Sequence, residues 1–127
     1  LYWLETVSAD GHVTLRPQAE IEALADGIAQ TLILCGHSHV ARVVRLSDGR
    51  LIVNPGSVGQ PAYDDDAPVY HKVETGHALA SYAVIEKTDK GFAPTLRTVA
   101  YDHMAMSRLA AKNDRPDWAS ALATGRV

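Results

Sequence analysis

The stretch Leu32-Ile33-Leu34-Cys35-Gly36-His37-Ser38-His39 joins an apolar run to a pair of histidines. Residues 31–35 are too few for a helix and are apolar on both faces, which is typical of a central strand. Gly36 lacks a side chain, as expected where the backbone bends sharply or passes close to another group. Because reactive groups are commonly held in loops at the carboxyl ends of strands, we predict a functional loop at His37 and His39.

The sequence around this stretch predicts short strands mixed with helices. Ile21, Leu24, Ala25 and Ile28 form one apolar stripe at helical spacing just before it. The Asp-Gly pairs at positions 10–11 and 48–49 are typical hairpin turns. The predicted order is a hairpin (2–15), a helix (17–26), a strand (31–35), a hairpin (40–46 and 50–54), a loop (55–79), a hairpin (80–86 and 92–101) and two helices (102–112 and 115–124). This order predicts a mixed α/β fold in which strands pair mainly with their sequence neighbours.

Length and composition narrow the class of protein. The chain has 127 residues, of which 46% are hydrophobic and 21% charged, so we expect one globular domain over 1–127. Twelve basic residues are scattered among fifteen acidic ones, which disfavours a nucleic-acid-binding patch or an anionic membrane surface. No apolar run is long enough to span a membrane, and a single cysteine forms no internal disulfide. A cytoplasmic location is the simplest expectation.

Two strand-end loops carry the candidate chemistry. Histidine is a common nitrogen ligand of Zn, Mn, Fe and Ni, and two histidines in one turn can reach one metal or two neighbouring metals. Asn54-Pro55-Gly56-Ser57 follows a second apolar strand and is typical of a rigid turn, with a positive φ at Gly56. Ser57 lacks the Gly-x-Ser-x-Gly setting of a nucleophile. Read alone, each loop is also compatible with a purely structural turn.

Together these motifs resemble a known family. Residues 36–39, followed by Asn54-Pro55-Gly56-Ser57-Val58-Gly59, are similar to the last motif block of the calcineurin-like metallophosphoesterases, above all their small bacterial members. The stretches 99–102, 113–118 and 124–126 also resemble the usual ending of those proteins. The likeness covers about residues 31–126 and is most specific over 32–66. It implies part of a four-layer αββα sandwich that hydrolyses phosphate esters with a metal-bridging hydroxide.

The resemblance also implies roles for individual residues. His37 and His39 would each ligate a different one of two divalent transition metals, with Mn, Fe, Zn and Ni all open. Asn54 and Ser57 would orient the ligands or shape the loops, with Gly36 and Gly56 as part of the same loops. Phosphomonoesters, phosphodiesters and phosphoproteins are all possible substrates.

The sequence departs from the family pattern in its first part. The upstream motifs Asp-x-His, Gly-Asp-x-x-Asp, Gly-Asn-His/Cys-Asp and a lone His-Gly are absent. Asp10-Gly11-His12 spells the first of them, but it lies in a predicted hairpin turn. Because the chain begins at Leu1 in mid-pattern, we expect the C-terminal part of a longer domain, with an N-terminal part of the same protein as its partner. Alone, these residues should be inactive and poorly soluble or oligomeric.

Other functions are weighed against this interpretation. A phosphoesterase-like scaffold that binds another protein without turnover is the main alternative, and degenerate upstream motifs would favour it. A cupin would need a glutamate within a few residues of His39, and 40–44 contain none. An amidohydrolase would need a long chain after its His-x-His. Both mononuclear alternatives are therefore disfavoured.

Several other side chains receive weaker predictions. Asp64–Asp66 should belong to a solvated loop and not to a cation site, since calcium-loop spacing is absent. His71 and His77 flank that loop and could line a substrate entrance.

Four further residues are expected to be structural. Cys35 should be a buried, inert thiol. Trp3 and Trp118 should be packing residues, and His103 should lie on the surface of a helix.

Overall fold

Short strands and helices alternate along the computed structural model, which describes residues 2–127. Leu1, where the sequence begins in mid-pattern, lies outside the described residues. The elements are β1 (Glu5–Val7), β2 (Val13–Leu15), α1 (Gln18–Leu24), β3 (Leu32–Leu34), β4 (Arg42–Arg45), β5 (Leu51–Asn54), β6 (Ala62–Asp65), β7 (His71–Glu74), β8 (Ala80–Thr88), β9 (Gly91–Val99), α2 (His103–Lys112) and α3 (Pro116–Thr124). The predicted mixed α/β class is confirmed.

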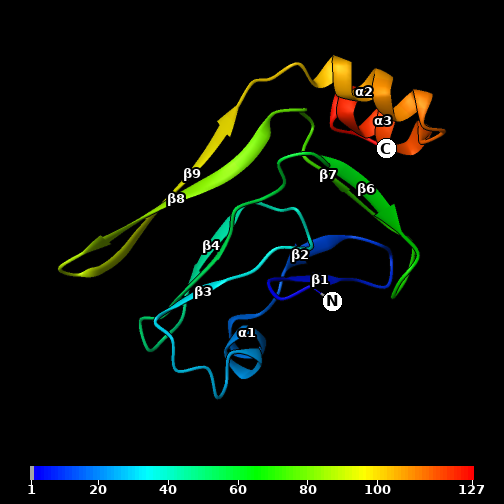
Figure 1. Ribbon diagram of the computed structural model, residues 1–127. Coiled ribbons are helices and arrows are strands. Elements are labelled where there is room, and N and C mark those ends of the chain that lie inside the picture. The colour runs from blue at the N-terminus through cyan, green and yellow to red at the C-terminus, as the bar shows by residue number, and fades with distance from the viewer. Residues whose placement is uncertain (1) are drawn as a thin grey trace.

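The strands form four small sheets, ordered β1-β2, β3-β5-β4, β6-β7 and β8-β9 (Figure 1). β3 runs parallel to β5, and β4 is antiparallel to β5. Among residues 2–127, β3 is therefore an edge strand, and the prediction of a central strand is wrong for this part of the molecule. Its second apolar face is not covered here, since Leu34 is 64% exposed. The sequence could not predict this, because an apolar run indicates that a strand is suited to burial on both faces but does not show which elements pack on those faces.

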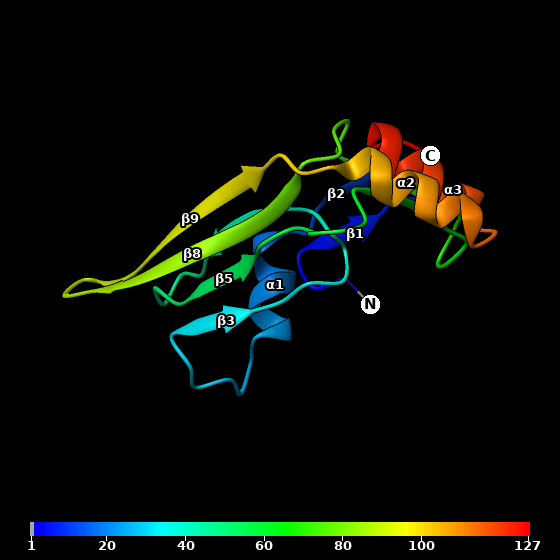
Figure 2. The same cartoon turned by 45° about the horizontal axis from the view of Figure 1, so that its top comes forward.

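Helix α1 packs on the three-stranded sheet and closes the main core (Figure 2). Its apolar stripe places Ile21 and Ala25 in full burial, as the helical spacing predicts. From the sheet side the core receives Ile33, Val44 and Ile52. Trp3 packs against this cluster, which confirms its prediction as a packing residue.

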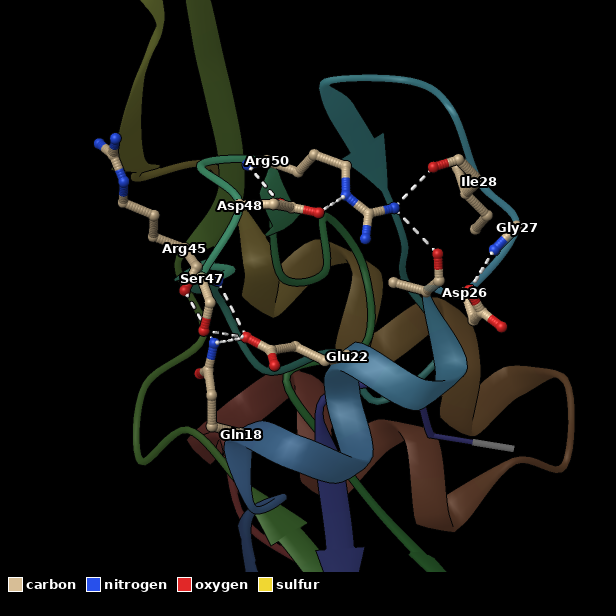
Figure 3. Close-up of polar contacts among 10 residues, drawn as sticks. Gln18, Glu22, Asp26, Gly27, Ile28, Arg45, Ser47, Asp48 and Arg50 are labelled. Carbon is tan, nitrogen blue, oxygen red and sulfur yellow. Dashed lines mark hydrogen bonds and ion pairs between the residues drawn. The ribbon is translucent and has the colours of Figure 1, made fainter.

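Polar contacts fix α1 to the β4–β5 turn (Figure 3). The Arg50 guanidinium donates to the carbonyl oxygens of Ala25 at 2.9 Å and Ile28 at 2.6 Å, just after the helix ends. The Glu22 carboxylate accepts from the backbone N–H and the hydroxyl of Ser47. These bonds satisfy groups that a helix end leaves without partners, and they hold the sheet and α1 as one unit.

Residues 62–65 and 71–74 form a hairpin where the sequence analysis predicted a loop over 55–79. Aspartate is depleted in strands, so the Asp64-Asp65-Asp66 run hid the first strand. The second strand carried a readable signal, because His71, Lys72, Val73 and Glu74 alternate between buried and exposed. Asp64 and Asp65 therefore lie on a strand, although both are exposed as expected.

The last third of the chain is a long two-stranded ribbon followed by two helices that pack together. β8 and β9 project as a ribbon beyond the rest of the molecule (Figures 1 and 2). Asp102 caps α2 by accepting from the Ala105 N–H at 2.9 Å. His103 is not simply a surface residue, because its Nδ1 lies 2.9 Å from the Leu122 carbonyl and ties α2 to α3.

None of the helices in the described residues 2–127 has the length and apolar character needed to cross a lipid bilayer.

Candidate metal centre

The two histidines lie in the loop that follows the carboxyl end of β3. His37 and His39 both have positive φ angles, of 69° and 60°. Side chains rarely adopt this left-handed conformation, and it is found preferentially at functional sites. Gly36, where a bend or close approach was expected, has neither a positive φ nor an atom within 4 Å of a Cβ placed there. The left-handed backbone conformation is thus found at the two histidines and not at Gly36.

Asn54 joins this loop to the turn after β5. Because β3 and β5 run parallel, their carboxyl ends lie side by side. Asn54 is fully buried, and its Nδ2 donates to the Gly36 carbonyl at 3.2 Å and to the Ser38 hydroxyl at 2.9 Å. Its Oδ1 accepts from the Gly56 N–H at 3.0 Å. One side chain therefore sets the spacing of the two strand-end loops.

The glycine in the second loop meets a stringent steric requirement. Gly56 has a φ of 85°, as the turn pattern predicts. A Cβ there would lie 2.8 Å from the Ser81 Cβ and 3.2 Å from the Ala41 Cβ. Only glycine allows the turn to sit this close to the base of β8, where the Ser57 carbonyl accepts from the Ser81 N–H.

A chain of hydrogen bonds orients the His39 ring. The Ser57 hydroxyl accepts from the Gln60 N–H, and the Gln60 carbonyl lies 3.0 Å from His39 Nδ1. A carbonyl only accepts, so Nδ1 carries the proton and Nε2 keeps its lone pair. This is the tautomer of a histidine that ligates metal through Nε2.

Burial adjusts the acid–base properties around the loop. It lowers the pKa of His39 and so favours the neutral ring. The hydrogen bond to the Gln60 carbonyl has a smaller effect that raises this pKa, and the nearby His37 has a smaller effect that lowers it. The Tyr63 ring packs edge-on against His39 with centroids 5.1 Å apart. Burial also raises the pKa of the Tyr63 hydroxyl well above its usual range, so this residue is a neutral hydrogen-bonding group.

His37 and His39 line a common cavity of about 270 Å³. Opposite them the same cavity is lined by Asp64 and Asp65 of β6 and by the start of α3. The sequence analysis did not foresee the following lining residues: Gln60, Tyr63, Arg115 and Asp117. The family resemblance of residues 113–118 did not place them at the histidine cavity, since the contact between α3 and β6 is purely tertiary.

Two tyrosines connect the loop to a buried histidine. The Tyr63 hydroxyl lies 3.1 Å from the Ser38 carbonyl and 2.9 Å from the Tyr2 hydroxyl, which is 2.8 Å from His71 Nε2. His71 is 2% exposed and its Nδ1 lies 2.8 Å from the Val69 carbonyl. His71 therefore does not line the cavity of the two histidines, and it borders a separate cavity with Asp10 and His12. Its place at a substrate entrance stays a prediction.

Four other predicted residues do not line the cavity of the two histidines: His12, His77, Asp10 and Cys35. His77 makes a local contact with the Leu79 N–H. His12 and Asp10 form an exposed pair with 3.5 Å between Nε2 and Oδ2, and they line a different cavity. Cys35 is half-buried, and burial raises the pKa of its thiol to about 11, so it stays protonated near neutral pH.

The donor set for a metal is partial. Within residues 2–127, no three histidine, cysteine, aspartate or glutamate side chains are placed to hold one ion together. Both imidazoles line the cavity, and the tautomer of His39 leaves its Nε2 available to a metal. A complete centre would need further donors.

Comparison with known proteins gives the class of protein. The sequence profile of the calcineurin-like phosphoesterase superfamily domain matches residues 7–77. The chain therefore belongs to this superfamily. No curated protein matches it significantly.

A solved structure, the crystal structure of a metallophosphoesterase from Sphaerobacter thermophilus, is similar to the chain with a TM-score of 0.60 and 23% sequence identity. The similarity covers 96% of this chain and 58% of the other, so the chain spans little more than half the length of that structure. At this identity the likeness establishes the fold.

Proposed function

We propose that the chain is part of a metal-dependent phosphoesterase in which His37 and His39 each ligate one of two divalent transition metals. The observation that carries this proposal is the His39 ring: its Nδ1 faces the Gln60 carbonyl, which leaves Nε2 free, and His39 shares a cavity with His37. Membership of the phosphoesterase superfamily supports the reaction class.

In this proposal the chain's own residues build and orient the site. Asn54 fixes the distance between the two loops, and Ser57 holds Gln60, which sets the tautomer of His39. Metal ions bound there supply Lewis acidity toward the phosphoryl group and a hydroxide nucleophile. Mn, Fe, Zn and Ni all accept imidazole, so the donor set leaves the metal open.

The remaining ligands would come from outside this chain. Two dications held close together need anionic ligands between them. Asp64 and Asp65 line the same cavity as the histidines, but among residues 2–127 no carboxylate joins both histidines in a group that could hold a metal. An N-terminal part of the same domain would supply them, in keeping with the 58% coverage of the solved relative. Its phosphate-ester substrate would be a phosphomonoester, a phosphodiester or a phosphoprotein.

Removing the proposed ligands tests the function. In the full-length protein, His37→Ala and His39→Ala should each lower bound metal, measured by elemental analysis, and abolish hydrolysis of nitrophenyl phosphate esters. His12→Ala is the matched control, since His12 is an exposed histidine at a separate cavity. Normal metal content and turnover in both loop variants would contradict the assignment.

The isolated 127-residue chain provides a second test. We expect it to show no phosphoesterase activity above the metal-ion background, and to be poorly soluble or oligomeric because the β3 edge is open. Its activity should appear only when the upstream part is present. A monomeric chain whose hydrolysis depends on His39 would contradict this expectation.

A scaffold without turnover is the alternative. The incomplete donor set and the exposed Leu34 on the β3 edge favour it. A full-length protein that binds no metal while folding normally would support the scaffold. For either function we propose a cytoplasmic location, because the one cysteine has no disulfide partner within the chain. We also propose that the protein forms homo-oligomers and that it binds neither nucleic acid nor membranes.

A further inference from the structure

An apolar cavity of about 520 Å³ lies between the α2–α3 pair and the loop after β5. Its walls are almost entirely hydrocarbon, and its principal lining residues are Val58, Tyr101, Met106, Leu109, Trp118 and Leu122. Several of these apolar side chains are exposed, although burying their surface would be energetically favourable.

This cavity adjoins the one that holds the histidines. Arg115 and Trp118 line both cavities. Of two consecutive residues in the loop after β5, Gly59 lines the apolar cavity and Gln60 lines the histidine cavity. The Arg115 guanidinium forms a two-pronged ion pair with Asp117 and lies 4.9 Å from the Trp118 ring centroid. The two cavities thus share the Arg115–Trp118 pair as part of their lining.

The Tyr101 ring lines this cavity, whereas its hydroxyl is buried within the protein and makes no hydrogen bond to any of residues 2–127. The cavity therefore offers a large apolar surface with very little polar lining, which suits an apolar group.

We infer that this cavity receives the organic group of the substrate, and that the substrate is a phosphate ester of an apolar, flat alcohol such as an aromatic one. The phosphoryl group would lie with His37 and His39, and the alcohol would pass over Trp118 toward Tyr101 and Met106. This inference rests on the proposed phosphoesterase function. It makes Trp118 and Met106 specificity-determining residues, with no part in the reaction itself.

Two methionines on α2 allow a matched test. Met106 lines the cavity and is 42% exposed, whereas Met104 is 44% exposed and is not among the lining residues. In the full-length protein, Met106→Asp should lower kcat/KM for 1-naphthyl phosphate about tenfold or more. The same variant should leave methyl phosphate hydrolysis within about twofold, and Met104→Asp should leave both unchanged. Equal losses on the two esters, or equal effects of the two variants, would overturn the inference.

A binding measurement separates this inference from the proposed function. The metal-free full-length protein should bind 1-naphthol, detected through fluorescence of the tryptophans, and Met106→Asp should weaken that binding about tenfold. Met104→Asp should leave naphthol binding unchanged, because Met104 does not line the cavity. Naphthol binding without hydrolysis of any ester would refute the phosphoesterase and leave the cavity assigned. Failure to bind naphthol, or a dimer that closes this face, would overturn the inference itself.

Discussion

The α1 and β3-β5-β4 region and the β8–β9 and α2–α3 region differ in how fully they bury their apolar side chains, although Leu34 at the β3 edge of the first is 64% exposed. In the first, Ile21 and Ile52 are fully buried in one cluster. In the second, Leu96 and Leu109 remain exposed, and the apolar side chains of the helices border a cavity. The first region forms a packed core beneath the histidine loop, whereas the second leaves apolar side chains accessible at its surface.

This difference matches the parts that the two regions take around the candidate site. A histidine loop with two left-handed residues needs rigid strands beneath it, because such a backbone persists only where its surroundings hold it. A surface for a substrate or partner needs uncovered apolar area instead. The molecule therefore divides between a region that fixes geometry and a region that offers contact.

The largest expected effect is a cavity in the packed region. Ile52→Ala removes a fully buried side chain and should lower the free energy of unfolding by about 2–5 kcal/mol. Leu96→Ala is the matched change in the ribbon, and should cost less than about 1 kcal/mol since Leu96 is 38% exposed. Urea denaturation of both variants in the full-length protein measures the two values. Similar losses would mean that the two regions do not differ as described.

Loss of the amide between the two loops should have the next largest effect. Asn54→Ala leaves the Ser38 hydroxyl and the Gly56 N–H without a partner, and removes one of the two hydrogen bonds that the Gly36 carbonyl accepts. We expect about 1–3 kcal/mol of destabilisation, and about a 10–100-fold loss of turnover if the site is metal-dependent. The effects of Asn54→Ala and Ser38→Ala should not add in a double-mutant cycle, because the two side chains share one bond. Full additivity would contradict the contact.

Adding a methyl group in the second loop should lower the free energy of unfolding by a similar or smaller amount than Asn54→Ala. Gly56→Ala places a Cβ against Ser81 at a left-handed φ, and should destabilise the protein by about 1–3 kcal/mol. Gly36→Ala is its control, because that position has open space and an ordinary φ. Its thermal midpoint should stay close to that of the wild type. Equal shifts for the two glycines would show that the loops are not held as described.

The smallest effect concerns pH. Hydrogen bonds from Ser47 and Gln18 lower the pKa of the Glu22 carboxyl below its ordinary value of 4.5. A carboxylate whose pKa is depressed on folding stabilises the protein above the unfolded pKa and loses this contribution as the pH falls through the folded value. Wild-type protein should therefore melt slightly above Glu22→Gln at pH 6, and the difference should shrink as the pH falls below 4.5. A difference that is constant with pH would contradict the contact.

The local elements were largely predictable because their causes are local. Helix spacing predicted which face of α1 is buried, and the Asp-Gly pair at 48–49 predicted the β4–β5 turn. The β6 strand escaped prediction because its aspartates contradict strand propensity, and pairing with β7 outweighed that preference. Trp118, expected to be a packing residue, borders two cavities because α3 packs on β6.

The sequence by itself determined the superfamily motifs, the mixed α/β order and the two loops that carry His37, His39 and Asn54, since each of these depends on residue type and short-range spacing. Only the tertiary structure decided that Gln60 sets the tautomer of His39, that His71 is buried, and that Arg115 and Trp118 lie beside the histidines. These relations join residues more than twenty positions apart, or depend on the burial of a single ring. Their physical origin is the packing of strands and helices against one another, and no local pattern encodes it.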